Sequence, residues 1–561
     1  MAVVNKKGEP MLGFYHLSCR HLCKQVFLVI LLLSCFLFAK GVAADNQYGG
    51  EYRVPLDSEP PSLDPAHITS IYAVNVAMNL FDGLVEFDKD LNIVPAIARV
   101  WKISRDHCTY TFFLRKGVLF HNGREVTSED FVFSFSRILN RDTQSPVASL
   151  FLNIKGAQEF HNGTSPEVVG LSAPDPYTLK IQLEQPFAPF LSILAMANGK
   201  VVPKEEIGPL FGRHPIGTGP FSFSSWQPGK EIVLTANENH YAGRPFLNTL
   251  RFHIYQNIEW EKIFDDFEKG LLEQSIIPSN KYDSIMSDNR YLEMYNLISK
   301  PTLNLVYLGM NVNMSPFNDH RVRQAISHAV NIEAIVRDIT KRGSIAAKGI
   351  LPPGIAGFDP HFEGYRYDPQ KALKLLEEAG FPQGRGIPPI EIWTVSKSES
   401  VQRELREYQR YLAAIGIEVI PRTANNWGEF IKFINEKKAP MYYAAWYADY
   451  PDPDNFLYVL CHSQSKTNRM GYQNHKVDEL LDQARRETDY MKRMVLYREV
   501  QKLVMVDAPL ISQHVNGFNY LFQPWVKGVE ASYLGAAYVP YKKVWVEKNL
   551  LAEKAQMLNS M

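Results

Sequence analysis

The chain has 561 residues, and its 60 lysine and arginine side chains balance its 60 aspartate and glutamate side chains, giving zero formal net charge at pH 7. Binding to nucleic acid or to an anionic membrane surface depends on an excess of basic residues, so we expect neither partner. A chain of this length is too long for one hydrophobic core, and we therefore predict two or more lobes.

The N-terminal segment 1–44 has the features of a secretory signal peptide. Basic residues precede an apolar run at 26–39, which is too short to span a bilayer. Small residues, Val42 and Ala44, then stand where a signal peptidase reads the chain. We predict cleavage after Ala44 and a soluble mature protein outside the cytoplasm. A start at Met11 would give a signal of more usual length.

Five cysteines bear on anchoring and on disulfides. The segment "LLSC" is an alternative lipobox that would make Cys35 a lipidated first residue, but the apolar run continues beyond it at 36–38, which argues against this. Cleavage after residue 44 leaves only Cys108 and Cys461. One disulfide between them is possible in an oxidising compartment, and the sequence leaves open whether they meet.

The first half of the mature chain is typical of strands with interspersed helices. Segments 110–120 and 177–183 resemble strands, and the second shows clean alternation of apolar and polar residues. Between them, Thr127 is a good helix cap, because its hydroxyl can satisfy a free amide of the first turn, with Asp130 three residues on.

Helices alternate with strands in the next part of the chain. The clearest helix begins at the cap Asp368 and stops at Gly380. It leads into a strand at 390–396, and an amphipathic helix at 401–414 precedes another strand at 417–423. This order predicts an α/β unit with a partly parallel sheet.

After about residue 510 the pattern returns to strands and loops, as in the first half. A chain that ends in the style in which it began predicts a discontinuous first lobe, with the second lobe inserted and a hinge at the two crossings. We therefore expect a first lobe with an extra subdomain at 45–312, a second lobe at 313–510, and a return to the first lobe with a C-terminal tail at 511–561.

Enzyme motifs are absent from the sequence. It contains no H-E-x-x-H, no G-x-S-x-G, no P-loop and no cluster of cysteine and histidine ligands, and an S-x-x-K match at 463–466 lacks its K-T-G partner. Three acids at Asp449, Asp452 and Asp454 do not have the spacing of a calcium loop. We expect a binding protein that is not an enzyme, with no metal and no cofactor.

Asp449 is the most informative single residue. Residues 444–448 predict a buried strand, Asp449 closes it, and Pro451 and Pro453 prevent its continuation. One interpretation is an ordinary turn aspartate. The other is a carboxylate at the end of an aromatic-walled strand that awaits a cation, since a buried charge without a partner is costly.

Seven segments of the chain form a recognisable set: "SEPPSLDPAHITS" (58–70), "YTFFLRKGVLFHNGREVTSEDFVFSFSRIL" (110–139), "HPIGTGPFSF" (214–223), "NHYAGRPFL" (239–247), "PFNDHRVRQAISHAVNIEAIV" (316–336), "YRYDPQKALKLLEEAGFP" (365–382) and "WYADYPDPDNF" (446–456). In this order they resemble the family 5 solute-binding proteins of ABC importers, which include oligopeptide- and dipeptide-binding proteins. The resemblance implies an α/β, two-lobed periplasmic-binding-protein type II (cluster C) fold with a discontinuous first lobe and a hinge.

The resemblance also implies roles for the residues around the W-x-x-D segment. In peptide-binding members the aspartate of this segment binds the free α-amino group of the peptide, and here it is Asp449. The strand before it pairs with the peptide backbone, which implies main-chain contacts for Ala445 and Tyr447 and a side-chain pocket at Trp446.

A second edge of the site is expected from the first lobe. The segment after "SLDP" corresponds to Thr69, Ser70 and Ile71 in this chain. Some family members anchor the peptide carboxylate with arginine or histidine at places that this sequence does not match, and Arg422 and Arg469 are candidates without further support.

The family implies an extracytoplasmic receptor that captures a short peptide, closes its lobes, and delivers the peptide to a membrane permease driven by ATPases. We expect it to be a monomer. The alternative is the same fold with a non-peptide solute, such as a metal chelate, haem, glutathione or an oligosaccharide, stacked on Trp446 and Tyr447. A secreted hydrolase would need a catalytic constellation that the sequence does not contain.

Overall fold

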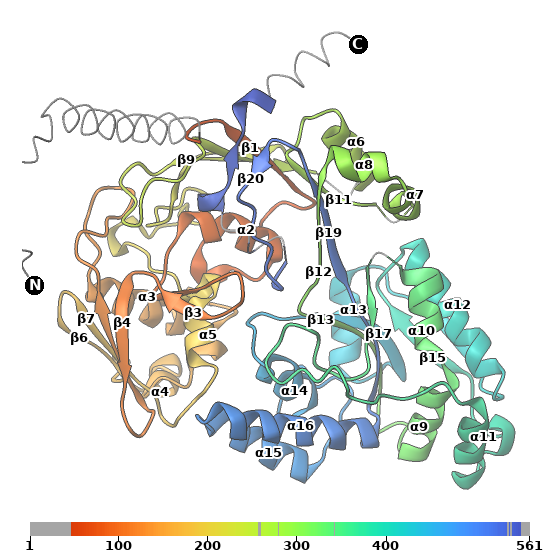
Figure 1. The fold of residues 1–561 in the computed structure, drawn as a ribbon. Coiled ribbons are helices and arrows are strands. Elements are labelled where there is room, and N and C mark those ends of the chain that lie inside the picture. The colour runs from red at the N-terminus through yellow and green to blue at the C-terminus, as the bar shows by residue number, and fades with distance from the viewer. Residues whose placement is uncertain are drawn as a thin grey trace, which may run out of the picture.

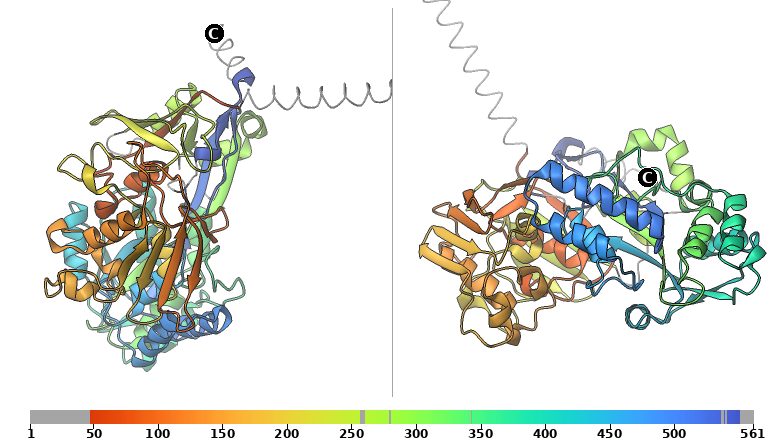
Figure 2. Two further views of the ribbon diagram at one scale, coloured as in Figure 1. Left: turned by 90° about the vertical axis from the view of Figure 1, so that its left-hand side faces the viewer. Right: turned by 90° about the horizontal axis from the view of Figure 1, so that it is seen from below.

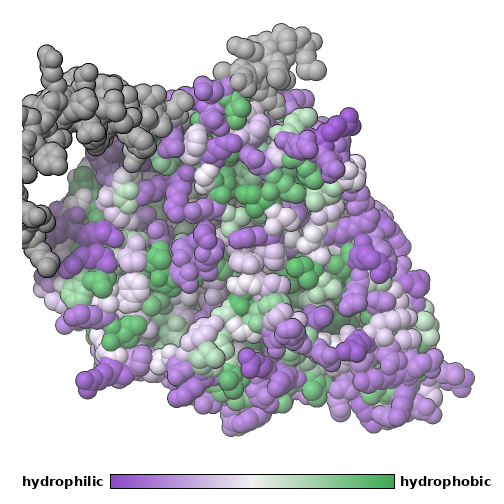
Figure 3. Space-filling view, in the orientation of Figure 1, coloured by the Kyte–Doolittle hydropathy of each residue, from purple (hydrophilic) through white to green (hydrophobic). Residues whose placement is uncertain are grey.

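The computed structural model describes residues 47–255, 260–278, 280–341, 343–535, 538 and 541–550. The predicted signal peptide with cleavage after Ala44, the alternative lipobox at Cys35 and the alternative start at Met11 all lie outside the described residues. Within these residues, no helix has both the length and the apolar character needed to cross a membrane. On the face drawn in Figure 3, hydrophobic side chains occur in patches separated by hydrophilic ones.

One region of the molecule is organised around two four-stranded sheets (Figure 1). In the first sheet, β1 (Glu51–Leu56) pairs in parallel with β10 (Thr249–Ile254). The sheet continues antiparallel through β9 (Glu231–Ala236) to β8 (Phe221–Gln227). Helix α2 (Ile71–Leu80) shares a hydrophobic core with this sheet, which fixes where the start of the helix lies.

The second sheet is antiparallel and has the order β4-β5-β7-β6. Its strands are β4 (Ala98–Ile103), β5 (Thr109–Leu114), β7 (Thr178–Gln182) and β6 (Leu171–Asp175). The predicted strand at 177–183 is β7. The predicted strand at 110–120 is only half correct, because β5 ends early and the chain turns at Gly117, whose φ of +73° suits glycine.

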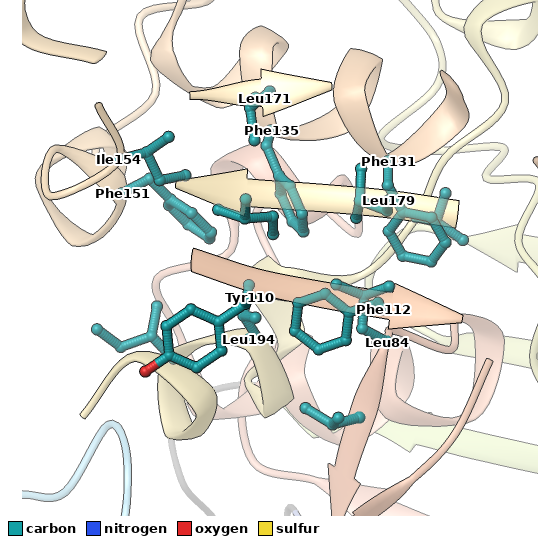
Figure 4. Close-up of a cluster of buried hydrophobic side chains, with 14 of the residues drawn as sticks. Leu84, Tyr110, Phe112, Phe131, Phe135, Phe151, Ile154, Leu171, Leu179 and Leu194 are labelled. Atoms are coloured by element: carbon teal, nitrogen blue, oxygen red, sulfur yellow. The ribbon is translucent and has the colours of Figure 1, made fainter. Parts of the chain in front are cut away.

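Helix α3 (Ser128–Leu139) covers this second sheet and begins where the sequence predicts. The backbone N–H of Thr127 donates a hydrogen bond of 2.8 Å to the Asp130 carboxylate, as in a capping box. Figure 4 shows Phe131 and Phe135 of the helix directed at the sheet, and both are fully buried. The core of this region therefore forms between one face of α3 and the inner face of the sheet.

The other region contains a six-stranded mixed sheet with the order β14-β18-β13-β17-β15-β16. Its strands are β14 (Ile345–Ala346), β18 (Leu510–Val515), β13 (Asn304–Met310), β17 (Met441–Tyr447), β15 (Ile390–Thr394) and β16 (Val419–Thr423). β15 pairs in parallel with both β16 and β17, and the other pairs are antiparallel. The predicted α/β unit with a partly parallel sheet is therefore present.

Helices cover both faces of the six-stranded sheet. One face packs against α14 (Asp454–Cys461), α15 (His475–Arg486) and α16 (Tyr490–Asp507), and the other against α9 (His320–Ala329), α11 (Pro369–Glu378) and α12 (Glu399–Ala413). Seen from below, α15 and α16 run side by side (Figure 2). Alternate residues of β13 enter the two cores, so this strand is buried on both sides.

Local sequence signals placed the helices of this region well. Helix α11 begins at its predicted cap, since the Asp368 carboxylate accepts a hydrogen bond from the Lys371 amide, and Gly380 follows its end with a φ of +89°. Shorter elements complete the described chain: β2 (Val85–Phe87), β3 (Ile93–Pro95), α4 (Ala157–His161), α5 (Phe190–Ala195), α6 (Trp260–Glu268), α7 (Tyr282–Ser287), α8 (Asn289–Met294), α10 (Ile332–Ile335), α13 (Trp427–Asn435), β20 (Val526–Lys527) and β21 (Trp545–Val546).

The chain passes between the two regions twice. β12 (Asn296–Pro301) and β19 (Gly517–Phe522) pair with each other, and β19 also pairs with β11 (Gln274–Ile276). β12 leads directly into β13, and β18 leads directly into β19 (Figure 1). The crossings are therefore at 302–303 and at Asn516. β13 and β18 both belong to the sheet of the second region. The range predicted for that lobe, 313–510, excludes all of β13 and all of β18 except Leu510.

The end of the described chain returns to the first region. Trp525, Tyr541 and Val546 lie in the same hydrophobic core as Tyr52 and Val54 of β1. The first region is therefore built from the beginning and the end of the described chain, with the second region inserted between them.

The two remaining cysteines do not form a disulfide. Cys108 is partly buried beside β5 in the first region, and Cys461 is buried at the end of α14 in the second region. Both are free thiols, which answers the question that the sequence left open.

A group of polar side chains binds the two crossings to each other. Asn304 has no exposed surface, and its side-chain amide donates hydrogen bonds of 2.6 Å to the Thr302 hydroxyl and 3.3 Å to the Asn516 carbonyl. Its side-chain oxygen accepts a bond of 2.9 Å from the Asn516 amide. The Thr302 amide adds a bond of 3.1 Å to the Asn516 carbonyl.

We predict that Asn304→Ala lowers the free energy of unfolding by about 1–3 kcal/mol, because it removes the side-chain bonds between the two crossings and leaves the Asn516 backbone N–H without a partner. Urea denaturation of the mature chain measures this change. Asn239→Ala is the control, since Asn239 is exposed and the change should stay within about 0.5 kcal/mol. Equal stability of the two variants would contradict the role given to Asn304.

Candidate functional site

A cavity of about 790 Å³ lies where the two regions meet at the crossings. Its volume is within the range of roughly 300–1,000 Å³ that is usual for sites of small ligands. The lining comes from the end of β1, the start of α2, the end of β17, the crossings, the start of β19 and nearby loops. Its main segments are 55–57, 68–72, 146–150, 196–198, 274–277, 302–303, 447–449, 516–520 and 534–535.

Asp449 faces this cavity and lies two residues beyond Tyr447, the last residue of β17. Its backbone N–H donates a hydrogen bond of 3.1 Å to the side-chain oxygen of Asn455. The carboxylate is exposed to the cavity, and no described lysine, arginine or histidine forms an ion pair with it. Partial removal from water raises the pKa of Asp449 above its usual 3.8, and a hydrogen bond with Asn455 offsets part of that rise.

The two neighbouring acids have different surroundings. Asp452 is buried and receives two bonds from Arg493, at 2.7 and 2.6 Å. Asp454 is fully buried and receives bonds of 2.6 and 3.0 Å from Arg485. Both are committed to structural ion pairs, so Asp449 is the member of this trio that is available to a ligand.

The free edge of β17 leads to Asp449. The Ala448 amide donates to Leu303 on the side of β13. Because bonding residues alternate along an antiparallel pair, Ala445 and Tyr447 direct their backbone groups away from β13. β15 pairs with β17 only at Met441 and the residue after it, so no described strand occupies that edge at Ala445 and Tyr447.

The expected strand residues therefore divide into two groups. Tyr447 lines the cavity and is 52% exposed, and its hydroxyl accepts a bond of 3.1 Å from Asn516 at the crossing. Ala445 and Trp446 are not among the lining residues. Trp446 packs against the core below the sheet, and its indole N–H donates a bond of 3.0 Å to Asn455. Asn455, which sequence reasoning missed, holds both Trp446 and the Asp449 backbone.

The cavity is also lined by Thr69, Ser70 and Ile71, which belong to the first region of the molecule, whereas the end of β17 belongs to the second. They form the start of a helix and not a strand edge: Ser70 caps α2 by accepting a bond of 3.3 Å from Ala73, and Ile71 is its first residue. A helix start attracts negative charge by about 0.3–1 kcal/mol, so this end of α2 is a mildly electropositive part of the wall.

Asp57 is a further lining residue that the sequence analysis did not identify. It follows β1 directly, and Tyr72, which also lines the cavity, interacts with its carboxylate. Partial burial raises the pKa of Asp57 above its usual range. In the sequence, Asp57 resembles an ordinary loop residue after a strand, and only the folded chain brings it to the same cavity as Asp449.

The two arginines considered as carboxylate anchors do not line the cavity. Arg422 pairs with Glu391 at 2.9 Å, and Arg469 donates to Asn435 at 2.9 Å. Among the described lining residues there is no lysine, arginine or histidine. The part of the chain that the structure describes also contains no group of three or more histidine, cysteine, aspartate or glutamate side chains placed to hold a metal ion.

Comparisons with known proteins identify the family. Residues 92–468, more than half of the chain, match the family model of bacterial extracellular solute-binding proteins, family 5. The chain is 29% identical over 502 residues to the dipeptide-binding protein of Escherichia coli strain K12, covering 84% of this chain and 90% of that protein. It is 30% identical over 501 residues to heme-binding protein A of Haemophilus influenzae, covering 85% and 89%.

A solved structure agrees in fold. The periplasmic binding protein DppA from Helicobacter pylori in complex with the peptide STSA has a TM-score of 0.75 and 27% identity, and the match covers 90% of this chain and all of that one. The chain belongs to family 5 of the solute-binding proteins of ABC importers, and it has the two-lobed α/β fold that the resemblance implied. The named relatives bind different solutes, so the family alone does not fix the ligand.

We predict that Asp449→Asn raises the melting temperature at pH 7. A raised pKa means that the ionised carboxylate costs free energy in the folded state, and the neutral amide removes that cost. The gain in melting temperature should shrink as the pH falls toward 3.8, because Asp449 of the unmodified protein becomes protonated in the folded state at a higher pH than in the unfolded state. Thermal denaturation at pH 7 and at about pH 4.5 measures both effects.

Asp454→Asn is the contrasting control for this prediction. It leaves Arg485 without its carboxylate partner, which should lower the free energy of unfolding by about 3–5 kcal/mol and therefore lower the melting temperature. A melting temperature that falls in both variants would show that Asp449 also has a structural role.

Proposed function

We propose that this chain is the extracytoplasmic substrate-binding component of an ABC importer and that it captures short peptides in the periplasm. The observation that carries the proposal is the Asp449 carboxylate, which faces the cavity at the end of an open strand edge without a cationic partner. Family membership supports a binding role, with transfer of the ligand to a membrane permease and its ATPases, over an enzymatic one.

The α-ammonium group of the peptide would form a charge-assisted hydrogen bond with Asp449, which sets the register of the peptide. An extended peptide next to β17 can then pair with the outward backbone groups of Ala445 and Tyr447. Main-chain pairing gives affinity that depends little on the side chains, which suits a receptor for varied short peptides. Thr69, Ser70 and Ile71 would contact the ligand from the start of α2.

Lobe closure follows from the position of the cavity. Its walls come from the first region and from the end of β17 in the second, so a ligand contacts both only when they are close together. Ligand binding therefore shifts the population toward the closed form, with the crossings at 302–303 and Asn516 as the hinge. The closed form is the one that we expect the permease to recognise.

A second candidate is a non-peptide solute with a flat ring system. Aromatic side chains line much of the same cavity, which favours stacking. They are Tyr72, Trp260, Tyr447, Phe518, Tyr520 and Tyr538. Native mass spectrometry of the protein purified from its own periplasm separates the candidates, because masses that fit short peptides support the first and one discrete non-peptide mass supports the second.

Calorimetry tests the role of Asp449 directly. We predict that Asp449→Asn lowers the affinity for a short peptide by about 2 kcal/mol or more, since it removes one partner of a desolvated ion pair. Acetylating the N-terminus of the same peptide should weaken binding to the unmodified protein similarly, and should add little in the variant.

Glu363→Gln is the matched control, because it also removes one negative charge, from a side chain that is 75% exposed on the surface. It should leave the affinity unchanged. Equal affinity of the Asp449→Asn variant and the unmodified protein would remove Asp449 from the site.

The pH dependence of binding follows from the same carboxylate. We predict that peptide affinity falls on acidification, beginning at a higher pH than an aspartate with the usual pKa of 3.8 would give, because protonation removes the negative charge that binds the ammonium group. Calorimetry between about pH 7 and pH 4 measures the fall. Constant affinity over this range would show that the bound amine does not depend on an ionised Asp449.

A further inference from the structure

We propose that the cavity selects ligands that carry two positive charges, with Asp57 as the site for the second one. This inference rests on the proposed function, in which Asp449 binds the first amine. In a peptide, the second charge would be the side chain of lysine, arginine or a similar basic residue.

The charges of the cavity wall are the first argument. The described lining residues include two carboxylates, Asp57 and Asp449, and no basic side chain. A peptide with one amine and one free carboxylate brings no net charge, so it would leave the closed cavity with two uncompensated negative charges. Enclosing unpaired charge is costly, and a ligand with two cationic groups removes that cost.

The surroundings of Asp57 are the second argument. Asp57 is half-buried, and its neighbour Tyr72 is a neutral side chain that does not cancel the charge of the carboxylate. No described lysine, arginine or histidine forms an ion pair with it. Asp57, Tyr72 and Tyr447 at the end of β17 all line the same cavity.

The neutral groups of the wall are the third, independent argument. Asn75 is 7% exposed and lines the cavity, and its side-chain oxygen accepts no hydrogen bond within the described chain. The Asn198 amide nitrogen is committed to the carbonyls of Pro65 and Ile68, at 2.7 and 3.1 Å, which leaves its oxygen for other donors. These acceptors suit a ligand that is rich in N–H donors, as ammonium and guanidinium groups are.

The two carboxylates also belong to different regions of the molecule. Asp57 follows β1 in the first region, and Asp449 follows β17 in the second (Figure 1). A ligand with two cationic groups would therefore connect the regions through two ion pairs. Selection of the ligand and closure of the cavity would use the same interactions.

Calorimetry with matched tripeptides tests the inference on the unmodified mature protein. Lysine is placed at each position of an alanine tripeptide and compared with norleucine, which has the same carbon chain without the amine. We expect the lysine form to bind about tenfold more tightly or better at one position at least. Amidation of the peptide C-terminus should preserve or increase the affinity, since the wall holds no basic side chain and offers a carboxylate only the weak attraction of the start of α2.

Variants assign the effect to Asp57. Asp57→Asn should reduce the ratio of the lysine to the norleucine affinity to about one, because the lysine peptide loses its second ion pair and the norleucine peptide has none to lose. Asp449→Asn should weaken both peptides together. Melting temperatures of both variants verify that they are folded.

The outcomes separate the inference from the proposed function. Equal binding of lysine and norleucine peptides, an unchanged preference in Asp57→Asn, or a loss of about tenfold or more on amidation would overturn the inference while peptide capture stands. Binding of a linear alkyl diamine without binding of any peptide would support selection for two charges and overturn peptide capture. If neither the peptides nor the diamine bind, both are overturned.

Discussion

The double crossing of the chain at 302–303 and Asn516, held together by Asn304, is the constraint on which the rest of the structure depends. Two neighbouring strands leave one sheet and enter another, and their hydrogen bonds to each other keep the two passages side by side. The cavity lies at this junction because it is where the walls of both regions approach. Tyr447 belongs to the cavity and receives a bond from Asn516, so the junction and the cavity share a contact.

Electrostatics decides what this junction is suited to bind. Within the stretch 449–454 two aspartates are neutralised internally by arginines, whereas Asp449 keeps its charge directed at open space. An ionised group in such a place is unfavourable for folding alone, and binding of a cationic ligand, as proposed above, would offset that cost. The proposal for Asp57 follows the same reasoning, since it and Asp449 are the two acidic side chains among the described lining residues.

Sequence reasoning identified the features that depend on local chemistry. The cap at Asp368 and the capping box at Thr127 are set by neighbours along the chain, and the structure places them as predicted. The buried strand predicted at 444–448 is wrong in part, because β17 ends at Tyr447 and both Ala445 and Tyr447 are exposed. Sequence reasoning failed where distant segments meet: nothing near Asp57 indicates that it shares a cavity with Asp449. The second edge of the site expected at Thr69, Ser70 and Ile71 is the start of a helix, because Ser70 caps α2. Trp446 was expected in the site and instead packs beneath it.

The separation of duties within the short stretch 449–454 bears on how such a scaffold can diversify. Asp452 and Asp454 secure the helices that follow, and Asp449 takes no part in that support. A descendant could exchange Asp449 for a neutral residue and adopt a new cargo, while the neighbouring anchors preserve the architecture. The fold can therefore be conserved while the ligand changes, which gives a physical reason why relatives named for a dipeptide and for haem are both similar to this chain.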